Sequence, residues 1–174
     1  YSDLGIIDSA AVYSRNASLF TDQSEDTVLM ASARNNLAYL NITHQRYDSA
    51  WHYLDEADWY LDRINLKNWR AAGLKAAVVD NRGMVLQAQE KYRAAIRGFQ
   101  ELRANLDPWI MKARKGKMAY RIGDNLYYLG QTDSAFAHFQ AAFLNLSTMG
   151  LIHKRLSQKD YFFDLCKKLL LLSR

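Results

Sequence analysis

Apolar and small residues recur at helical spacing in four segments of the chain. Each segment begins with a tetrapeptide that ends in alanine, and these alanines are Ala10, Ala50, Ala95 and Ala135. In the last three segments, apolar residues follow four and seven positions after the alanine: Leu54 and Ala57, Phe99 and Leu102, and Phe139 and Ala142. Offsets of about four and seven residues place the three side chains on one face of an α-helix. The pattern predicts four helices with small residues that let a neighbouring helix approach closely.

A second set of helices is predicted upstream of these. Each of these upstream helices carries a small residue, Ala38, Gly83 or Gly123, that lies 12 residues before the alanine of the following helix. The predicted unit is therefore a pair of helices, A then B, that meet at small residues. Cys166 lies 43 residues after Gly123 and marks one more A helix. The predicted order is a B helix at 1–20, three pairs at about 24–66, 68–106 and 108–150, and a partial unit at 157–174.

Helix boundaries are predicted from capping residues. Ser24 or Asp22 is expected to cap the first A helix, and Pro108 suits the first position of the third. Gly130 and Gly150 suit helix ends that require a left-handed residue.

The composition agrees with an all-α fold. The chain has 174 residues, of which 49% are apolar and 24% are charged, as in an average globular domain. Eight glycines and one proline are too few for many short strands joined by tight turns. The single cysteine excludes an internal disulfide and a Cys-based zinc site, and no apolar run reaches the length of a membrane span.

The repeat resembles the tetratricopeptide repeat (TPR) family. That family places Leu-Gly, Tyr, Ala, Phe, Ala and Pro in order within about 34 residues. The matching positions are Arg82-Gly83, Tyr92, Ala95, Phe99 and Pro108, with further matches at Leu37-Ala38, Tyr47, Ala50, Leu54 and Ala57, and at Ile122-Gly123, Ala135, Phe139 and Ala142. The period is longer here, because the key alanines lie 40 to 45 residues apart. The resemblance implies a right-handed superhelix of stacked antiparallel helix pairs, an α-solenoid.

Long-period repeats of this type resemble the sensory or regulatory parts of bacterial signalling proteins. The chain begins at Tyr1 rather than Met, so we expect a processed product or a fragment. The last predicted A helix has no B helix, which predicts at least one more helix beyond Arg174. The localisation stays open between the bacterial periplasm and the cytoplasm.

The resemblance also implies a binding groove lined by the A helices. The residues that it places there are, unit by unit, Ser32, Asn35, Tyr39 and Ile42, then Ala77, Asp80, Met84 and Gln87, then Lys117, Tyr120, Asp124 and Tyr127, with Asp160, Phe163, Lys167 and Leu170 from the partial unit. Tyrosine suits such a surface, because it buries a large ring and keeps a polar tip. The alternative is that some of these tyrosines pack between adjacent helices.

Some members of the family grip the terminal carboxylate of a peptide with Lys, Asn and Arg side chains. Asn81, Lys117 and Arg121 stand at three of the five corresponding positions, whereas Asn35 and Tyr39 stand where Lys and Asn would be. Lys117 and Arg121 lie four residues apart on one helical face, where two cations can bind a carboxylate or a phosphate.

The net charge of +5 is matched by one cluster: Lys112, Arg114, Lys115, Lys117 and Arg121. Without these five, 18 basic residues face 18 acidic ones. We therefore expect a solvated helix face or a contact with an acidic peptide rather than a nucleic-acid site. Asp55, Glu56 and Asp58 are likewise expected on a solvated face of a B helix.

Enzyme motifs are absent from the sequence. The four histidines lack metal-ligand spacing, and no phosphate loop, nucleophile elbow or carboxylate pair is present. We therefore expect a non-enzymatic domain without a cofactor that binds a peptide or protein in its groove. Two alternatives stay open: a small-ligand sensor that uses the same groove, and self-association through open end faces.

Overall fold

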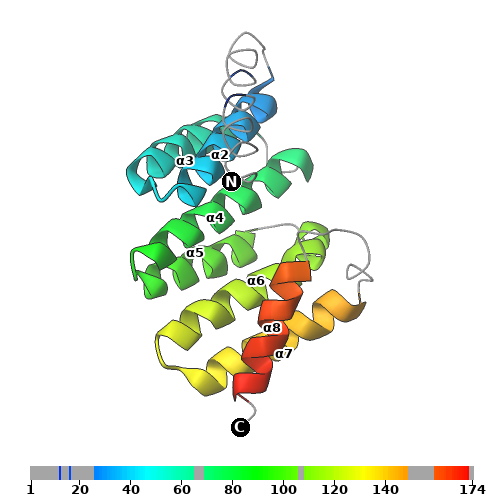
Figure 1. The fold of residues 1–174 in the computed structure, drawn as a ribbon. Coiled ribbons are helices and arrows are strands. Elements are labelled where there is room, and N and C mark those ends of the chain that lie inside the picture. The colour runs from blue at the N-terminus through cyan, green and yellow to red at the C-terminus, as the bar shows by residue number, and fades with distance from the viewer. Residues whose placement is uncertain are drawn as a thin grey trace. The chain divides into compact units, whose positions relative to one another are not determined.

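The computed structural model of the chain is all-helical in the part that it describes. This part comprises residues 12, 16, 26–64, 69–105, 108–148 and 159–172, and it contains seven helices and no strand. The helices are α2 (Thr27–Thr43), α3 (Tyr47–Leu61), α4 (Trp69–Ala88), α5 (Tyr92–Asn105), α6 (Pro108–Tyr128), α7 (Thr132–Thr148) and α8 (Lys159–Leu172), shown in Figure 1. The predicted all-α class is confirmed. None of these helices is both long and apolar enough to cross a membrane.

The chain divides into two compact units, residues 1–89 and residues 90–174. The first contains α2, α3 and α4, and the second contains α5 to α8. The predicted A helices correspond to α2, α4, α6 and α8, and the described B helices are α3, α5 and α7.

Helix α2 begins after Asp26, whose carboxylate accepts hydrogen bonds from the backbone N–H groups of Val28 at 3.0 Å and Leu29 at 3.1 Å. The prediction of Ser24 or Asp22 as the cap is therefore wrong, and both of those residues lie outside the described part. Asp26 caps the helix because it directly precedes the first helical residue, from where its carboxylate reaches the exposed N–H groups of the first turn.

The same turn connects A and B helices at three places. A residue in the left-handed region lies five positions before each key alanine: Gln45 with φ of 59°, Glu90 with φ of 58° and Gly130 with φ of 73°. Two of the turns also share a hydrogen bond back into the A helix, from Arg46 N to Asn41 O at 2.8 Å and from Gln131 N to Leu126 O at 3.0 Å. This is the pattern of a Schellman cap. The left-handed role predicted for Gly130 is confirmed, and Gly150 lies outside the described part.

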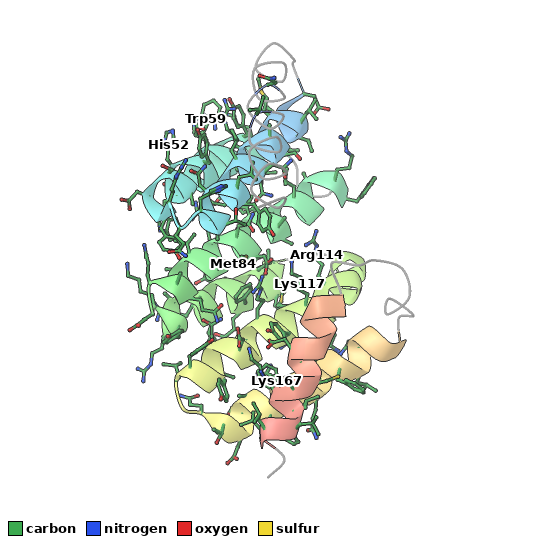
Figure 2. All side chains as sticks on the ribbon, viewed as in Figure 1. His52, Trp59, Met84, Arg114, Lys117 and Lys167 are labelled. Carbon is green, nitrogen blue, oxygen red and sulfur yellow. The ribbon has the colours of Figure 1, made fainter. Side chains whose placement is uncertain are left out.

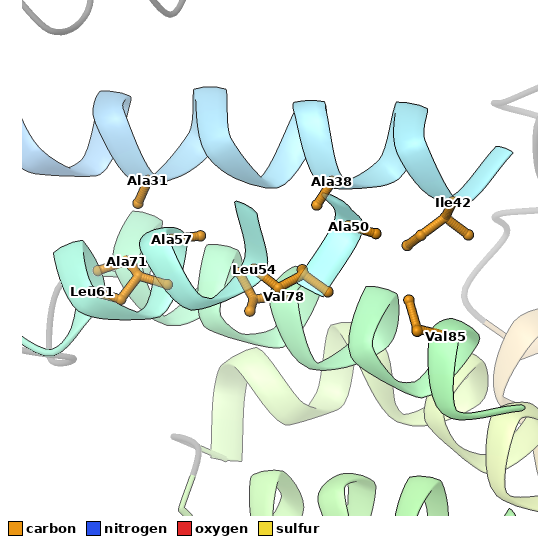
Figure 3. Packing of buried hydrophobic residues seen from close by; sticks show 10 residues of the cluster. All are labelled: Ala31, Ala38, Ile42, Ala50, Leu54, Ala57, Leu61, Ala71, Val78 and Val85. Atoms are coloured by element: carbon orange, nitrogen blue, oxygen red, sulfur yellow. The ribbon is translucent and has the colours of Figure 1, made fainter. Parts of the chain in front are cut away.

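The core of the first unit forms where α2, α3 and α4 meet (Figure 3). Small residues Ala31, Ala38, Ala50 and Ala57 are 0% exposed, so the helices approach closely there. Larger side chains fill the remaining space, among them Leu54, Leu61, Val78 and Val85. The predicted contact between Ala38 on the A helix and the alanine face of the B helix is confirmed.

The second unit repeats this packing at α6 and α7. Ala135, Phe139 and Ala142 of α7 are 0% exposed. A Cβ atom added at Gly123 of α6 would lie 3.0 Å from the ring of Phe139, so glycine allows the two helices to approach. The predicted small-residue contact is therefore also found in this unit. Helix α8 packs against α7, and α5 packs against α6.

Asn125 of α6 is 0% exposed, and its amide is only partly satisfied. Its Nδ2 atom donates to the Arg121 carbonyl at 2.7 Å, whereas its Oδ1 atom meets no hydrogen-bond donor among the described residues. The equivalent position of α4 is Val85, which is also 0% exposed. Each of the two lies two residues after the contact glycine of its helix.

We expect Asn125→Val to raise the free energy of unfolding by about 1 kcal/mol. A buried polar atom without a partner costs about 1–3 kcal/mol, and Asn and Val have similar helix propensities. Urea denaturation followed by circular dichroism measures the change. A loss of stability would show that the Asn125 amide contributes more to the fold than its single hydrogen bond indicates.

Candidate binding surfaces

The predicted groove residues of the first unit include a pair that bonds two A helices together. Asn81 of α4 donates from Nδ2 to Oδ1 of Asn35 on α2 at 2.9 Å, and both side chains are buried. Asp80, beside Asn81, is buried as well. The bond between Asn35 and Asn81 lies within the α2–α4 contact, where a buried amide needs a partner of this kind.

In the second unit, four side chains bond α6 to α8. The Tyr120 hydroxyl donates to Oδ2 of Asp164, and the Lys168 ammonium donates to Oδ1 of Asp124. Lys168 also lies 3.0 Å from Oδ2 of Asp164 and 3.3 Å from the Tyr120 hydroxyl. One ammonium thus bridges both carboxylates and the phenol, and Tyr120 and Asp124 are buried in the process.

The network shifts the pKa values of Tyr120, Asp164 and Lys168. Burial raises the pKa of Tyr120, and its hydrogen bond to Asp164 raises it further. Burial alone would lower the pKa of Lys168, but its hydrogen bond to Asp124 and the negative charge there outweigh that effect and raise it. Burial favours a higher pKa for Asp164, yet hydrogen bonds from Tyr120 and Lys168 hold it below its usual range. At neutral pH the Asp164 carboxylate and the Lys168 ammonium are therefore charged and the Tyr120 phenol is neutral.

The two A-helix contacts share one register. Asn35 and Tyr120 each lie three residues before the small contact residue of their helix, Ala38 and Gly123 respectively. Their partners lie two residues before the corresponding residue of the next A helix: Asn81 before Gly83, and Asp164 before Cys166. Equivalent positions therefore bond in both units, although the side-chain types differ.

The acidic residues of α3, for which the sequence predicted a solvated face, differ in exposure: the side chain of Asp55 is 68% exposed, that of Glu56 37% and that of Asp58 18%. Asp58 pairs with Lys75 at 2.7 Å and with Arg82 at 2.9 Å, and Arg82 also reaches Asp55 at 2.6 Å. Glu56 pairs with Arg34 of α2 at 2.9 Å. The prediction therefore agrees with the exposure of Asp55 but not with that of Asp58, whose basic partners Lys75 and Arg82 come from α4, 17 or more residues away in sequence. A count of like charges along one helix does not reveal such partners.

The remaining predicted groove residues differ in exposure. Tyr39 is 49% exposed, and Lys117 is exposed on α6. Met84 packs partly buried against the core of the first unit. Arg121 and Tyr127 are half-buried, and the Tyr127 ring meets Tyr128 edge-on at 5.9 Å. Of the residues predicted from the partial unit, Lys167 and Leu170 are exposed, and the side chains of Asp160 and Phe163 lie outside the described part.

The predicted carboxylate clamp stays a prediction. Asn81 belongs to the first unit and donates to Asn35. Lys117 and Arg121 belong to the second unit and lie on one face of α6.

Two open hollows lie on the first unit. One of about 430 Å³ is lined by Asp55, Glu56, Trp59 and Tyr60, and the guanidinium of Arg63 stacks 3.3 Å from the Trp59 ring centre. The other, of about 330 Å³, lies at the turn between α2 and α3; it is lined by 45–49 and Gln89. Neither lining includes Tyr39, Tyr120 or Tyr127. The described part also holds no group of His, Cys, Asp and Glu side chains that could bind a metal ion.

In comparisons with known proteins, no family model matches the chain, and no curated protein matches it.

Proposed function

We propose that the chain is a non-enzymatic helical repeat domain of the tetratricopeptide type that binds a peptide or protein through its A helices. In this proposal it is the sensory or regulatory part of a larger bacterial signalling protein. The observation that carries the proposal is the shared register of the A-helix contacts, Asn35 with Asn81 and Tyr120 with Asp164. A constant register between successive A helices is what a stack of repeats requires, and such stacks bind partners along an extended surface.

Tyr39 is the side chain best suited to contact a partner in the first unit. It lies one turn after Asn35 on α2 and leaves 49% of its surface exposed, while Asn35 is held by Asn81. An exposed tyrosine on a rigid helix offers a large apolar contact and a polar tip at low entropic cost. The alternative is a small-molecule sensor that uses the same A-helix surface; the two hollows described for the first unit lie away from the predicted groove residues.

We expect Tyr39→Ala to weaken peptide binding at least about tenfold, because removing an aromatic anchor from an interface costs about 1–2 kcal/mol or more. Peptides selected from a displayed random library on the wild-type protein serve as probes, and their dissociation constants are measured by fluorescence anisotropy. Trp59→Ala is the matched control, because Trp59 is a similarly exposed aromatic residue on the B helix α3. Its expected effect is less than about twofold.

Two results would contradict the proposal. One is a library that yields no peptide above background. The other is a set of peptides that lose affinity equally with Trp59→Ala and Tyr39→Ala, since the A helices would then have no special role.

A further inference from the structure

Helix α8 has the register of an A helix. The hydrogen bond between Tyr120 of α6 and Asp164 of α8 fixes this register, because the two residues occupy the positions at which α2 bonds to α4 in the first unit. Cys166 of α8 is therefore the equivalent of Gly123 on α6 and of Ala38 on α2.

In α2 and α6, this small residue lies against the B helix that follows. Ala38 is 0% exposed in the core that α2 shares with α3, and a Cβ atom at the buried Gly123 would lie 3.0 Å from the Phe139 ring of α7. Four residues further along the same face, Ile42 of α2 is 8% exposed and Tyr127 of α6 is half-buried. A B helix thus covers this face of both A helices.

The same face of α8 is open. Cys166 is half-buried, and Leu170, the equivalent of Ile42, is 69% exposed. Lys167, labelled in Figure 2, is also exposed on this side of the helix. Within the described part of the chain, α8 therefore lacks the helix that the repeat places against α2 and α6.

The opposite side of α8 is packed within the second unit. Leu165 is 0% exposed, and α8 packs against α7. Lys168 bonds to Asp124 of α6. The open face accordingly belongs to a helix that its other contacts hold in place.

The B helices that cover this face elsewhere share one pattern: a small residue, a large one four positions later and a small one seven positions later. The residues are Ala50, Leu54 and Ala57 of α3 and Ala135, Phe139 and Ala142 of α7. All of them are 0% exposed. The small residues let the two backbones approach, and the large one fills the space between them.

We infer that the face of α8 around Cys166 and Leu170 is a docking surface for a helix of a partner protein that carries this small–large–small pattern. Such a helix continues the packing of α6, α7 and α8, and it takes the place that α3 has on α2 and α7 has on α6. Grooves of this kind recognise side chains on one face of an amphipathic helix. The inference goes beyond the proposed function, because Tyr39 lies on another helix and at another position of the repeat.

The single cysteine of the chain provides a local test. An aromatic disulfide that releases a coloured thiolate reacts with Cys166 only when it can reach the sulfur, so a helix docked over this face slows the reaction. The probe is a synthetic peptide with the sequence of residues 46–63, acetylated and amidated, which contains α3. We expect saturating peptide to slow the reaction of the full chain at least about fivefold.

The control peptide carries Ala50→Gln with Ala57→Gln. It keeps the charge and a high helix propensity but places longer side chains at the two small positions. We expect it to leave the rate of the Cys166 reaction unchanged, because the backbones of the two helices can then no longer approach closely.

The decisive variant of the chain is Leu170→Gln, which keeps Cys166 as the reporter. We expect it to weaken the peptide at least about tenfold, as judged from the peptide concentration that gives half of the protection. The matched control is Leu171→Gln, because Leu171 is 55% exposed and lies about 100° further around the helix. It should change the affinity less than about twofold, and circular dichroism checks the fold of both variants.

Four outcomes overturn the inference. The α3 peptide does not protect Cys166, or the control peptide protects it equally. The two leucine variants weaken the peptide to the same extent. Light scattering shows a dimer that Leu170→Gln abolishes, so that a second copy covers the face. Finally, in a longer form of the chain, residues beyond Arg174 protect Cys166 without added peptide, so that the occupant is the chain's own next helix.

Discussion

Phe139→Ala is expected to lower the free energy of unfolding of the second unit by about 3–5 kcal/mol, the usual loss for a fully buried phenylalanine. Phe139 is 0% exposed on α7, and its ring lies 5.8 Å from the Tyr120 ring of α6. The cavity left by alanine cannot close easily, because α6 and α7 already approach at Gly123. Urea denaturation followed by circular dichroism measures the loss.

Phe143→Ala is the matched control for this prediction. It removes the same side chain from the same helix at a position that is 39% exposed, so the expected loss is about 1 kcal/mol. If both variants lost equal stability, the contact between Phe139 and Gly123 would not be the centre of the α6–α7 packing.

Lys168→Met is expected to lower the free energy of unfolding by about 3–5 kcal/mol, because one partner of a buried ion pair is removed. The variant leaves Asp124, which is 5% exposed, without the ammonium that it now binds. It also removes the pair of Lys168 with Asp164 within α8, whereas the bond from the Tyr120 hydroxyl to Asp164 still joins α8 to α6. Chemical denaturation at neutral pH measures the difference.

Lys167→Met is the control, since Lys167 is the exposed neighbour of Lys168 and its loss should change stability by about 0.5 kcal/mol or less. A double variant, Asp124→Leu with Lys168→Met, should recover much of the loss, because it leaves no buried charge behind. If the double variant were no more stable than Lys168→Met alone, the loss would not arise from the stranded charge of Asp124.

The same network makes the stability of the fold depend on pH, and the pKa of Asp164 defines the sign of that dependence. The pKa of Asp164 is lower in the folded chain than its usual value, so its contribution to stability is present above the unfolded pKa. That contribution is lost as the pH falls through the lower, folded pKa. The difference in the free energy of unfolding between the wild type and Lys168→Met should therefore become smaller in acid.

Local patterns predicted the helices and their contact faces well. The small and apolar residues at offsets 0, 4 and 7, such as Ala50, Leu54 and Ala57, and the glycine at 123 lie where α-helices meet, because a helical period and a small side chain are properties of neighbouring residues. The left-handed conformation of Gly130 was also predicted, because glycine is favoured at helix ends that require a left-handed residue. The cap of α2 was missed by two to four residues, since several polar residues precede that helix and the fold selects Asp26.

Among the predicted site residues, the sequence did not reveal which ones bond to other helices. Tyr120 and Asp124 share a face with Lys117, yet they are buried against α8 while Lys117 is exposed. The signal that points to their partners is the equivalence of positions in successive A helices. Once one such bond between A helices is known, the equivalence of positions predicts which residues bond in the next pair of A helices.

The sequence by itself determined an all-α chain of paired helices, because the spacing of small and apolar residues is read within one or two turns. The tertiary structure decided which polar groups bond, since Asn35 with Asn81 and Tyr120 with Asp164 join positions 46 and 44 residues apart. It also divided a chain of modest net charge into units of −3 and +8. Charge acts through space rather than along the chain, so ion pairs such as that of Asp58 with Lys75 form only once the helices are assembled.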